Sequence, residues 1–170
     1  IANAARLRWE PIIEKWVSPE QRGFLPGRSM LNNVLDVEEE SMTTALLQEE
    51  GALILFDFVA AFPSISQAFL IKSLQHLGLP PEAVQLAQAL YNDLSCEVAL
   101  QGNKFPGFHM TAGIKQGCPL SPLLYVLVAD SLLRMIKTKM PTAKARAFAD
   151  DTAVVIQDVY RDLPELRKTF

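Results

Sequence analysis

The stretch ALILFDF, residues 52–58, is the centre of this sequence, because it joins a run of apolar residues to a single acid. The apolar run Ala52–Phe56 follows Gly51, and its length and composition predict a strand that is buried on both faces. Asp57 comes directly after this strand. Because the ends of neighbouring strands meet at one edge of a sheet, Asp57 is a candidate for a functional site.

Two more acids lie in the turn of a second predicted hairpin. Strands are expected at 146–148 and 152–156, which places Asp150 and Asp151 at the tip between them. If these strands share a sheet with the first one, the two acids can meet Asp57. Clustered carboxylates repel one another and need cations, and their hard oxygens suit Mg²⁺ or Mn²⁺. Each acid motif alone is also common as a structural turn, so further motifs must decide.

Helical spacing and turn residues predict the remaining elements. Expected helix starts include a Ser29 cap, a capping box from Ser64 to Gln67, and a Ser121 cap followed by Pro122. The predicted helices cover residues 2–16, 29 to about 48, 64–77, 80–90 and 121–139, and another hairpin covers 96–110. This order predicts an α+β fold with helices on one face of a small, largely antiparallel sheet.

Composition restricts the class of protein. With 170 residues, of which 49% are hydrophobic, the chain can bury one substantial core. The longest apolar stretches fall short of the roughly 20 residues that a membrane span needs, so we expect no membrane partner. Cys96 and Cys118 have no metal-ligand spacing, which suits a reducing nuclear or cytoplasmic compartment. The net charge of −3 is unfavourable for a complete nucleic-acid surface, and Ile1 in place of Met suggests a piece of a longer protein.

Four blocks in a fixed order resemble the reverse transcriptase family of the non-LTR retrotransposon and group II intron type. They are QRGFLPGRS (21–29), ALILFDFVAAF (52–62), GIKQGCPLSPLL (113–124) and FADD (148–151). The third block is the most specific, and together the blocks span most of the chain. The resemblance implies a polymerase palm with part of the fingers, and an RNA-directed DNA polymerase that transfers nucleotides from dNTPs to a primer 3′-OH on an RNA template.

The resemblance also implies roles for the acids. Asp57 and Asp150 would be metal ligands, with Asp151 as the second acid of the pair and the backbone carbonyl of Phe58 completing the coordination. The implied cofactors are two Mg²⁺ or Mn²⁺ ions. Such ions activate the attacking hydroxyl and stabilise the leaving pyrophosphate.

Further residues are implied to contact the nucleotide and the template. Phe62, next to Ala61, would pack under the sugar and exclude a ribose 2′-hydroxyl. Gln116 and Gly117 would lie beside the incoming dNTP, and Arg28 would contact a template phosphate. The structural alternatives are a core phenylalanine, a solvent-facing glutamine and a solvated arginine.

The chain departs from the family pattern at three positions. Ala60 stands where Lys is frequent, and Pro63 and Asn32 stand where Asp is frequent. No proposed metal ligand is affected. We expect residues 1–50 to be a remnant of the fingers and 51–170 to be the palm, with the thumb absent. The isolated fragment should therefore be inactive and should bind primer-template weakly in a filter or anisotropy assay.

Two other functions fit parts of the sequence. One is a decayed or domesticated reverse-transcriptase-like domain that binds RNA or protein without polymerising, which the retained acids disfavour. The other is an RNA-dependent RNA polymerase. That class more often has Gly before the acid pair and lacks an aromatic gate such as Phe62.

Overall fold

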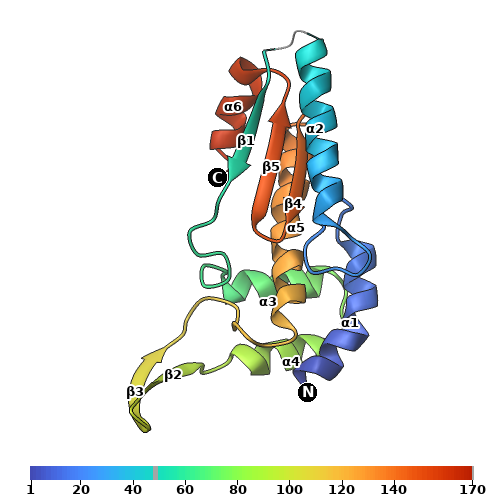
Figure 1. Ribbon diagram of the computed structural model, residues 1–170. Coiled ribbons are helices and arrows are strands. Elements are labelled where there is room, and N and C mark those ends of the chain that lie inside the picture. Colours follow the sequence, from blue (N-terminus) through green and yellow to red (C-terminus); the bar gives the residue numbers. More distant parts are fainter. Residues whose placement is uncertain (48–49, 170) are drawn as a thin grey trace. The chain divides into compact units, whose positions relative to one another are not determined.

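The computed structural model describes residues 1–47 and 50–169, which belong to two compact units (Figure 1). The first unit comprises Ile1–Val59 and Cys118–Phe170, and the second comprises Ala60–Gly117. Helices and antiparallel strands occur in both units, so the predicted α+β class is confirmed. The division into fingers and palm at residue 50 stays a prediction. Within the described residues, no helix has the length and apolar character needed to cross a membrane.

The helices of the first unit are α1 (Ala2–Trp16), α2 (Met30–Leu46), α5 (Ser121–Lys139) and α6 (Val159–Arg167). Ser29 caps α2 as predicted, since its hydroxyl accepts the backbone N–H of Leu31. The predicted end of α2 near Gln48 lies outside the described residues. Helix α6 was not predicted, although Asp158 is a recognisable cap that accepts the N–H of Arg161 at 3.0 Å.

The sheet of the first unit has the strand order β1 (Ala52–Phe56), β5 (Asp151–Ile156), β4 (Lys144–Phe148), with both pairings antiparallel. One face of this sheet packs on α5 and α6 through a buried core that includes Val154, Ile156, Leu133, Ile136 and Leu166. The opposite face borders α2, which lies along β4. The expectation that helices cover a single face is therefore wrong.

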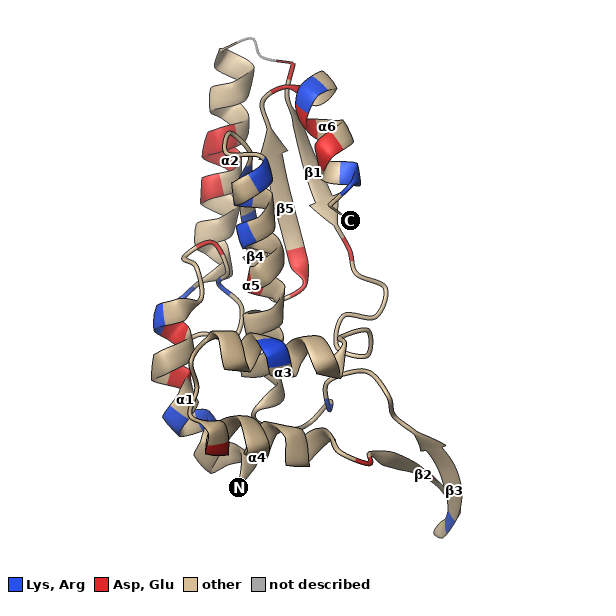
Figure 2. Cartoon of the chain, turned by 180° about the vertical axis from the view of Figure 1, so that it is seen from behind, with Lys and Arg blue, Asp and Glu red and all other residues tan. Residues whose placement is uncertain are grey.

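Ion pairs join α2 to strand β4. The sequence of α2 contains Asp and Glu residues but no Lys or Arg (red segments on α2 in Figure 2). Asp36 of α2 pairs with Arg146 of β4 at 2.7 Å and with Arg22 at 2.8 Å. Glu40 lies 3.8 Å from Lys144 of β4. These contacts are polar, so an apolar stripe does not reveal which surface α2 faces.

Strand β1 has the predicted bounds but is not buried on both faces. It forms one edge of the sheet, and Leu53 and Leu55 are 47% and 72% exposed. Only the alternate residues Ala52, Ile54 and Phe56 pack on the core. A continuous apolar run is typical of a strand covered on both sides. Here the second face instead borders a groove.

The second unit contains α3 (Gln67–His76), α4 (Pro81–Tyr91) and the hairpin of β2 (Ser95–Leu100) and β3 (Asn103–His109). Helices α3 and α4 bury Leu70, Leu74, Val84 and Ala87. Gln101 and Gly102 form the hairpin turn with φ values of 49° and 80°. Two positive φ values match the turn that suits the twist of a hairpin.

Two predicted helix caps are wrong by one or two residues. Helix α3 is capped by Ser66, whose hydroxyl accepts the N–H of Phe69 at 3.3 Å, while the hydroxyl of Ser64 donates to the carbonyl of Ala61. The capping-box spacing was therefore misleading. In α5 the cap position belongs to Leu120, and Ser121 is already helical. Helix ends commonly vary by one or two residues, so a local pattern does not fix the exact cap.

Candidate functional site

Three carboxylates come to the same end of the first unit's sheet. The pairing of β1 with β5 ends at Phe56 and Thr152, so Asp57 leaves β1 where Asp151 begins β5. Asp150 precedes Asp151 in the β4–β5 turn. Asp57 and Asp151 are exposed and Asp150 is half-buried. The antiparallel register thus brings together the acids that the sequence singled out.

Tyr125 of α5 lies near the acid pair and was missed by the sequence analysis. Burial, together with the negative charges of Asp150 and Asp151, raises the pKa of its phenol to about 12. The phenol therefore keeps its proton at neutral pH and cannot serve as a base there. A tyrosine within a long apolar helix has the same sequence pattern as any core residue, so its position near the acids could not be predicted from the sequence.

The donor set is chemically suited to hard divalent cations. Among the described residues, no Lys or Arg forms an ion pair with Asp57, Asp150 or Asp151. Uncompensated carboxylate oxygens at one place favour Mg²⁺ or Mn²⁺. In the same described part of the chain, no three His, Cys, Asp or Glu side chains are arranged as a ready metal site. The carboxylate oxygens are of the chemical type that binds these ions, but the three side chains are not arranged around a common metal position.

A groove of about 590 Å³ runs along the exposed sheet face as far as Asp151. It lies between α2 and the outer residues of the sheet, with Leu55, Phe148 and Asp151 in its lining. Leu55, which was predicted to be buried, therefore lies on an open surface. The groove gives solvent access to the Asp151 side of the sheet.

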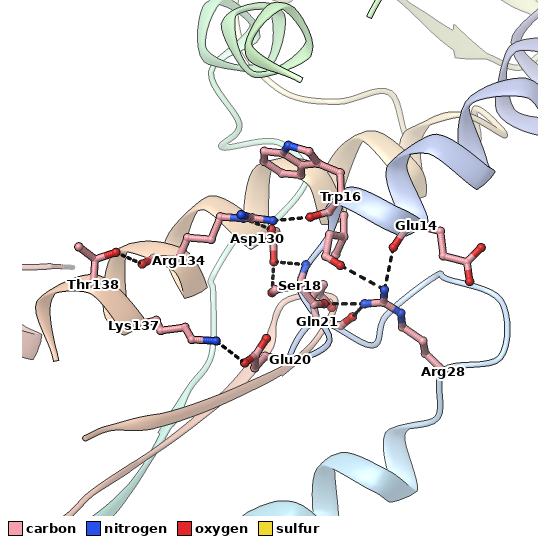
Figure 3. Close-up of polar contacts among 11 residues, drawn as sticks. Glu14, Trp16, Ser18, Glu20, Gln21, Arg28, Asp130, Arg134, Lys137 and Thr138 are labelled. Carbon is pink, nitrogen blue, oxygen red and sulfur yellow. Dashed lines mark hydrogen bonds and ion pairs between the residues drawn. The ribbon is translucent and has the colours of Figure 1, made fainter. Parts of the chain in front are cut away.

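Arg28 is occupied by contacts within its own unit. Its two Nη atoms donate to the carbonyl oxygens of Ser18 and Gln21, both at 2.6 Å, and of Glu14 and Val17 at 2.9 and 3.2 Å (Figure 3). These bonds satisfy carbonyls at the end of α1 and in the following loop. A role for Arg28 in template binding stays a prediction, and it would have to be compatible with these four bonds.

The residues implied to contact the nucleotide are in the second unit. The backbone N–H of Ile114 donates to the carbonyl of Phe62 at 2.9 Å, which places the Phe62 segment, with Ala61, beside the loop that contains Gln116 and Gly117. Gln116 and Gly117 are exposed, and Phe62 and Ala61 are half-buried. Their roles in nucleotide binding stay predictions.

Gly113 allows the two segments of the second unit to approach closely. It has a φ of 93°, and a Cβ atom there would lie 3.0 Å from the carbonyl oxygen of Pro63. Its N–H donates to the carbonyl of Ile65 at 2.8 Å, and its carbonyl accepts from Gln67 at 3.3 Å. The most specific block of the sequence is therefore joined to the Phe62 block by backbone contacts.

Residues 2–170 match the family model described as "Reverse transcriptase (RNA-dependent DNA polymerase)". The chain belongs to the reverse transcriptase family. It is similar to the Pol polyprotein of the type-2 retrotransposable element R2DM of Drosophila melanogaster, with 32% identity over 78% of this chain and 13% of that protein. It is also similar to the transposon TX1 149 kDa protein of Xenopus laevis, with 25% identity over 94% of this chain and 13% of that protein. These relatives confirm the predicted non-LTR type.

Solved structures agree with the fold. Apo telomerase from Candida tropicalis superposes with a TM-score of 0.73 at 10% identity, over 99% of this chain and 33% of that one. At this identity the likeness concerns the fold alone. The reverse transcriptase domain described here spans 13% of the length of each of the two retrotransposon relatives.

Proposed function

We propose that the protein carrying this chain is an RNA-directed DNA polymerase that transfers nucleotides from dNTPs to the 3′-OH of a DNA primer on an RNA template. The observation that carries the proposal is the strand register that delivers Asp57, Asp150 and Asp151 to one end of the sheet. Membership of the reverse transcriptase family supports the same reaction. Nuclear or cytoplasmic localisation is proposed with it, because the two cysteines are free thiols.

The three carboxylates act as ligands in this proposal. Asp57, Asp150 and Asp151 would hold two Mg²⁺ or Mn²⁺ ions, and the backbone carbonyl of Phe58 would add an oxygen. Bound in this way, the ions would supply charge stabilisation for an in-line phosphoryl transfer. The residues of the chain contribute the position and negative charge of the site. Tyr125, which stays protonated, adds no charge of its own beside the acid pair.

In this proposal, residues of the second unit discriminate dNTPs from rNTPs. Phe62 would exclude a 2′-hydroxyl by steric contact, since a rigid ring rejects a larger sugar. Ala61, Gln116 and Gly117 would lie along the incoming dNTP. The backbone bond between Ile114 and Phe62 supports this assignment, because it keeps the gate and the loop in one structural unit.

Primer extension by the full protein tests the proposal. Extension on an RNA template with Mg²⁺ and dNTPs is expected, with Asp150→Ala as the inactive control. Phe62→Ala should raise the use of rNTPs. Absence of extension under all conditions would favour the decayed domain, and a preference of the unmodified protein for rNTPs would favour an RNA-dependent RNA polymerase.

A further inference from the structure

The amide of Gln21 contacts the backbone of the β4–β5 turn, at Ala149, from a position 128 residues earlier in the chain. The side chain is fully buried, with 0% of its surface exposed. Its Oε1 accepts the N–H of Ala149 and the N–H of Gly23, both at 2.9 Å. Its Nε2 donates to the carbonyl of Ala149 at 3.1 Å. Both polar groups of Ala149 are therefore bound by one side chain.

Ala149 needs such support because of its conformation. It has a φ of 59°, in the left-handed region that alanine disfavours and glycine tolerates. It directly precedes Asp150, so its dihedral angles set the direction of the next residues. A free hairpin would relax toward a conformation that suits alanine better. The Gln21 amide opposes this change by binding the N–H and the carbonyl together.

The backbone around Gln21 holds the same turn independently. The N–H of Arg22 donates to the carbonyl of Ala147 at 2.8 Å, and the N–H of Ala147 donates to the carbonyl of Glu20 at 2.9 Å. These bonds form a parallel bridge along the edge of β4. Gly23 comes so close that a Cβ atom there would lie 2.1 Å from the nitrogen of Ala149. The backbone of residues 20–23 is therefore in direct contact with the backbone of the β4–β5 turn.

We propose that Gln21 is a positioning residue of the active site, which orients Asp150 and Asp151 by fixing the backbone of Ala149. The inference deepens the proposed function and rests on it for its catalytic meaning. An amide suits the task because one oxygen accepts two N–H groups while the NH₂ group donates. The ionised carboxylate of a glutamate can accept but cannot donate. The thioether of a methionine has a similar volume to the glutamine side chain but cannot replace its hydrogen bonds.

Hydrogen exchange in the full protein tests the contact without metal or substrate. Gln21→Met keeps the length of the side chain and removes its hydrogen bonds. We expect the Ala149 amide, localised by fragmentation of a peptide spanning 145–152, to exchange about tenfold faster, the factor that loss of one buried hydrogen bond produces. Thr44→Val is the matched control, because it removes a buried hydroxyl that bonds the carbonyl of Glu40 within α2.

A metal titration tests the consequence for the site. The Mg²⁺ concentration for half-maximal primer extension should rise about 10–100-fold in Gln21→Met, as is usual when a group that orients a ligand is lost. Thr44→Val should leave it unchanged. Faster exchange at Ala149 with an unchanged Mg²⁺ requirement would overturn the positioning role. Absence of extension by the unmodified protein would contradict the proposed function, while the exchange experiment would still decide the contact.

Gln21→Glu provides a second variant that retains the shape if Gln21→Met does not fold. Burial raises the pKa of the introduced carboxyl, and its protonated form can again donate to the carbonyl of Ala149. The ionised form still accepts the N–H of Ala149, but it sets a buried negative oxygen against the carbonyl of Ala149, which favours opening of the turn. Protection of the Ala149 amide, corrected for intrinsic exchange, should therefore be near normal at about pH 5 and clearly lower at about pH 8. Protection that does not depend on pH would overturn the inference, because a side chain that only fills space has no reason to respond to protonation.

Discussion

The chain contains two hairpins that differ in what holds them. The β4–β5 hairpin packs on α5 and α6, pairs with β1 on one side and bonds the segment at Gln21 on the other. The β2–β3 hairpin is exposed along almost its whole length. Its turn has positive φ values at Gln101 and Gly102, the pair of dihedrals that a two-residue hairpin turn adopts, whereas the β4–β5 turn places Ala149 in the left-handed region beside distant contacts. One hairpin depends on distant contacts, and the other is encoded locally.

This difference shows which contacts fix the orientation of residues in a turn. A turn that follows local preference needs no support, but it also has no distant partner that fixes its direction. A turn that opposes local preference persists only if the surrounding structure holds it, and such turns concentrate at functional sites. The acid pair lies in the second kind of turn. The two hairpins therefore predict different responses to the same kinds of mutation.

The largest expected difference concerns the acids. In the full protein, Asp150→Ala should reduce primer extension by a factor on the order of 10³ or more, because several kcal/mol of charge stabilisation depend on the metal ligands. Asp93→Ala, which removes an exposed acid 3.5 Å from His109 at the base of the other hairpin, is the matched control. Steady-state extension rates measure both. Comparable losses in the two variants would mean that Asp150 has no special role.

Core truncation should separate the hairpins by stability. Ile156 of β5 is fully buried, and Ile156→Ala should lower the free energy of unfolding by about 2–5 kcal/mol. Val98 of β2 is 53% exposed, and Val98→Ala should change it by less than about 0.5 kcal/mol. Urea denaturation followed by circular dichroism gives both values. A large loss for Val98→Ala would show that the exposed hairpin is covered in solution.

Glycine substitutions test the two turns directly. A Cβ atom at Gly23 would overlap the backbone of Ala149, so Gly23→Ala should cost about 1–3 kcal/mol through forced displacement. Gly102 has open space around it and a φ of 80°, so Gly102→Ala should cost only about 1 kcal/mol of backbone strain. Unfolding midpoints give the ranking. Only Gly23→Ala is expected to alter primer extension as well.

Local encoding also explains which features the sequence could predict. The bounds of β1, the Ser29 cap, the Pro80–Pro81 helix start and the exposed hairpin follow from neighbouring residues. The three acids were found because they stand at strand ends. Reverse transcriptase membership followed from short blocks in a fixed order, each of which can be recognised locally.

Features that depend on distant contacts could not be predicted. The contact between Gln21 and Ala149 joins residues that have no sequence relation, and Arg28 bonds carbonyls up to 14 positions away. The exposed face of β1 was missed because an apolar run does not report which neighbours are present. Tyr125 could not be predicted for the same reason, since the shift of its pKa depends on burial and on charges that the fold brings near it.

The smallest expected effect concerns the ion pairs that join α2 to the β4–β5 hairpin. Hydrogen bonds from Arg146 and then Arg22 hold the pKa of Asp36 below its ordinary value. A lowered folded pKa contributes stability that is present above the ordinary carboxyl pKa and is lost as the pH falls through the folded value. Asp36→Asn should therefore lower the melting temperature by about 2–4 °C at neutral pH, and the difference should shrink as the pH falls below the ordinary carboxyl pKa of about 4.

Glu97→Gln is the control from the other hairpin. It removes an ion pair of 2.7 Å with Lys104 in which the two side chains are 59% and 74% exposed. Exposed pairs contribute little because solvent screens them. Differential scanning fluorimetry across pH should show a pH-dependent difference for Asp36→Asn and almost none for Glu97→Gln. Equal effects would mean that α2 adds no more support to its hairpin than a solvent-exposed pair adds to the other, which would weaken the contrast between the two turns.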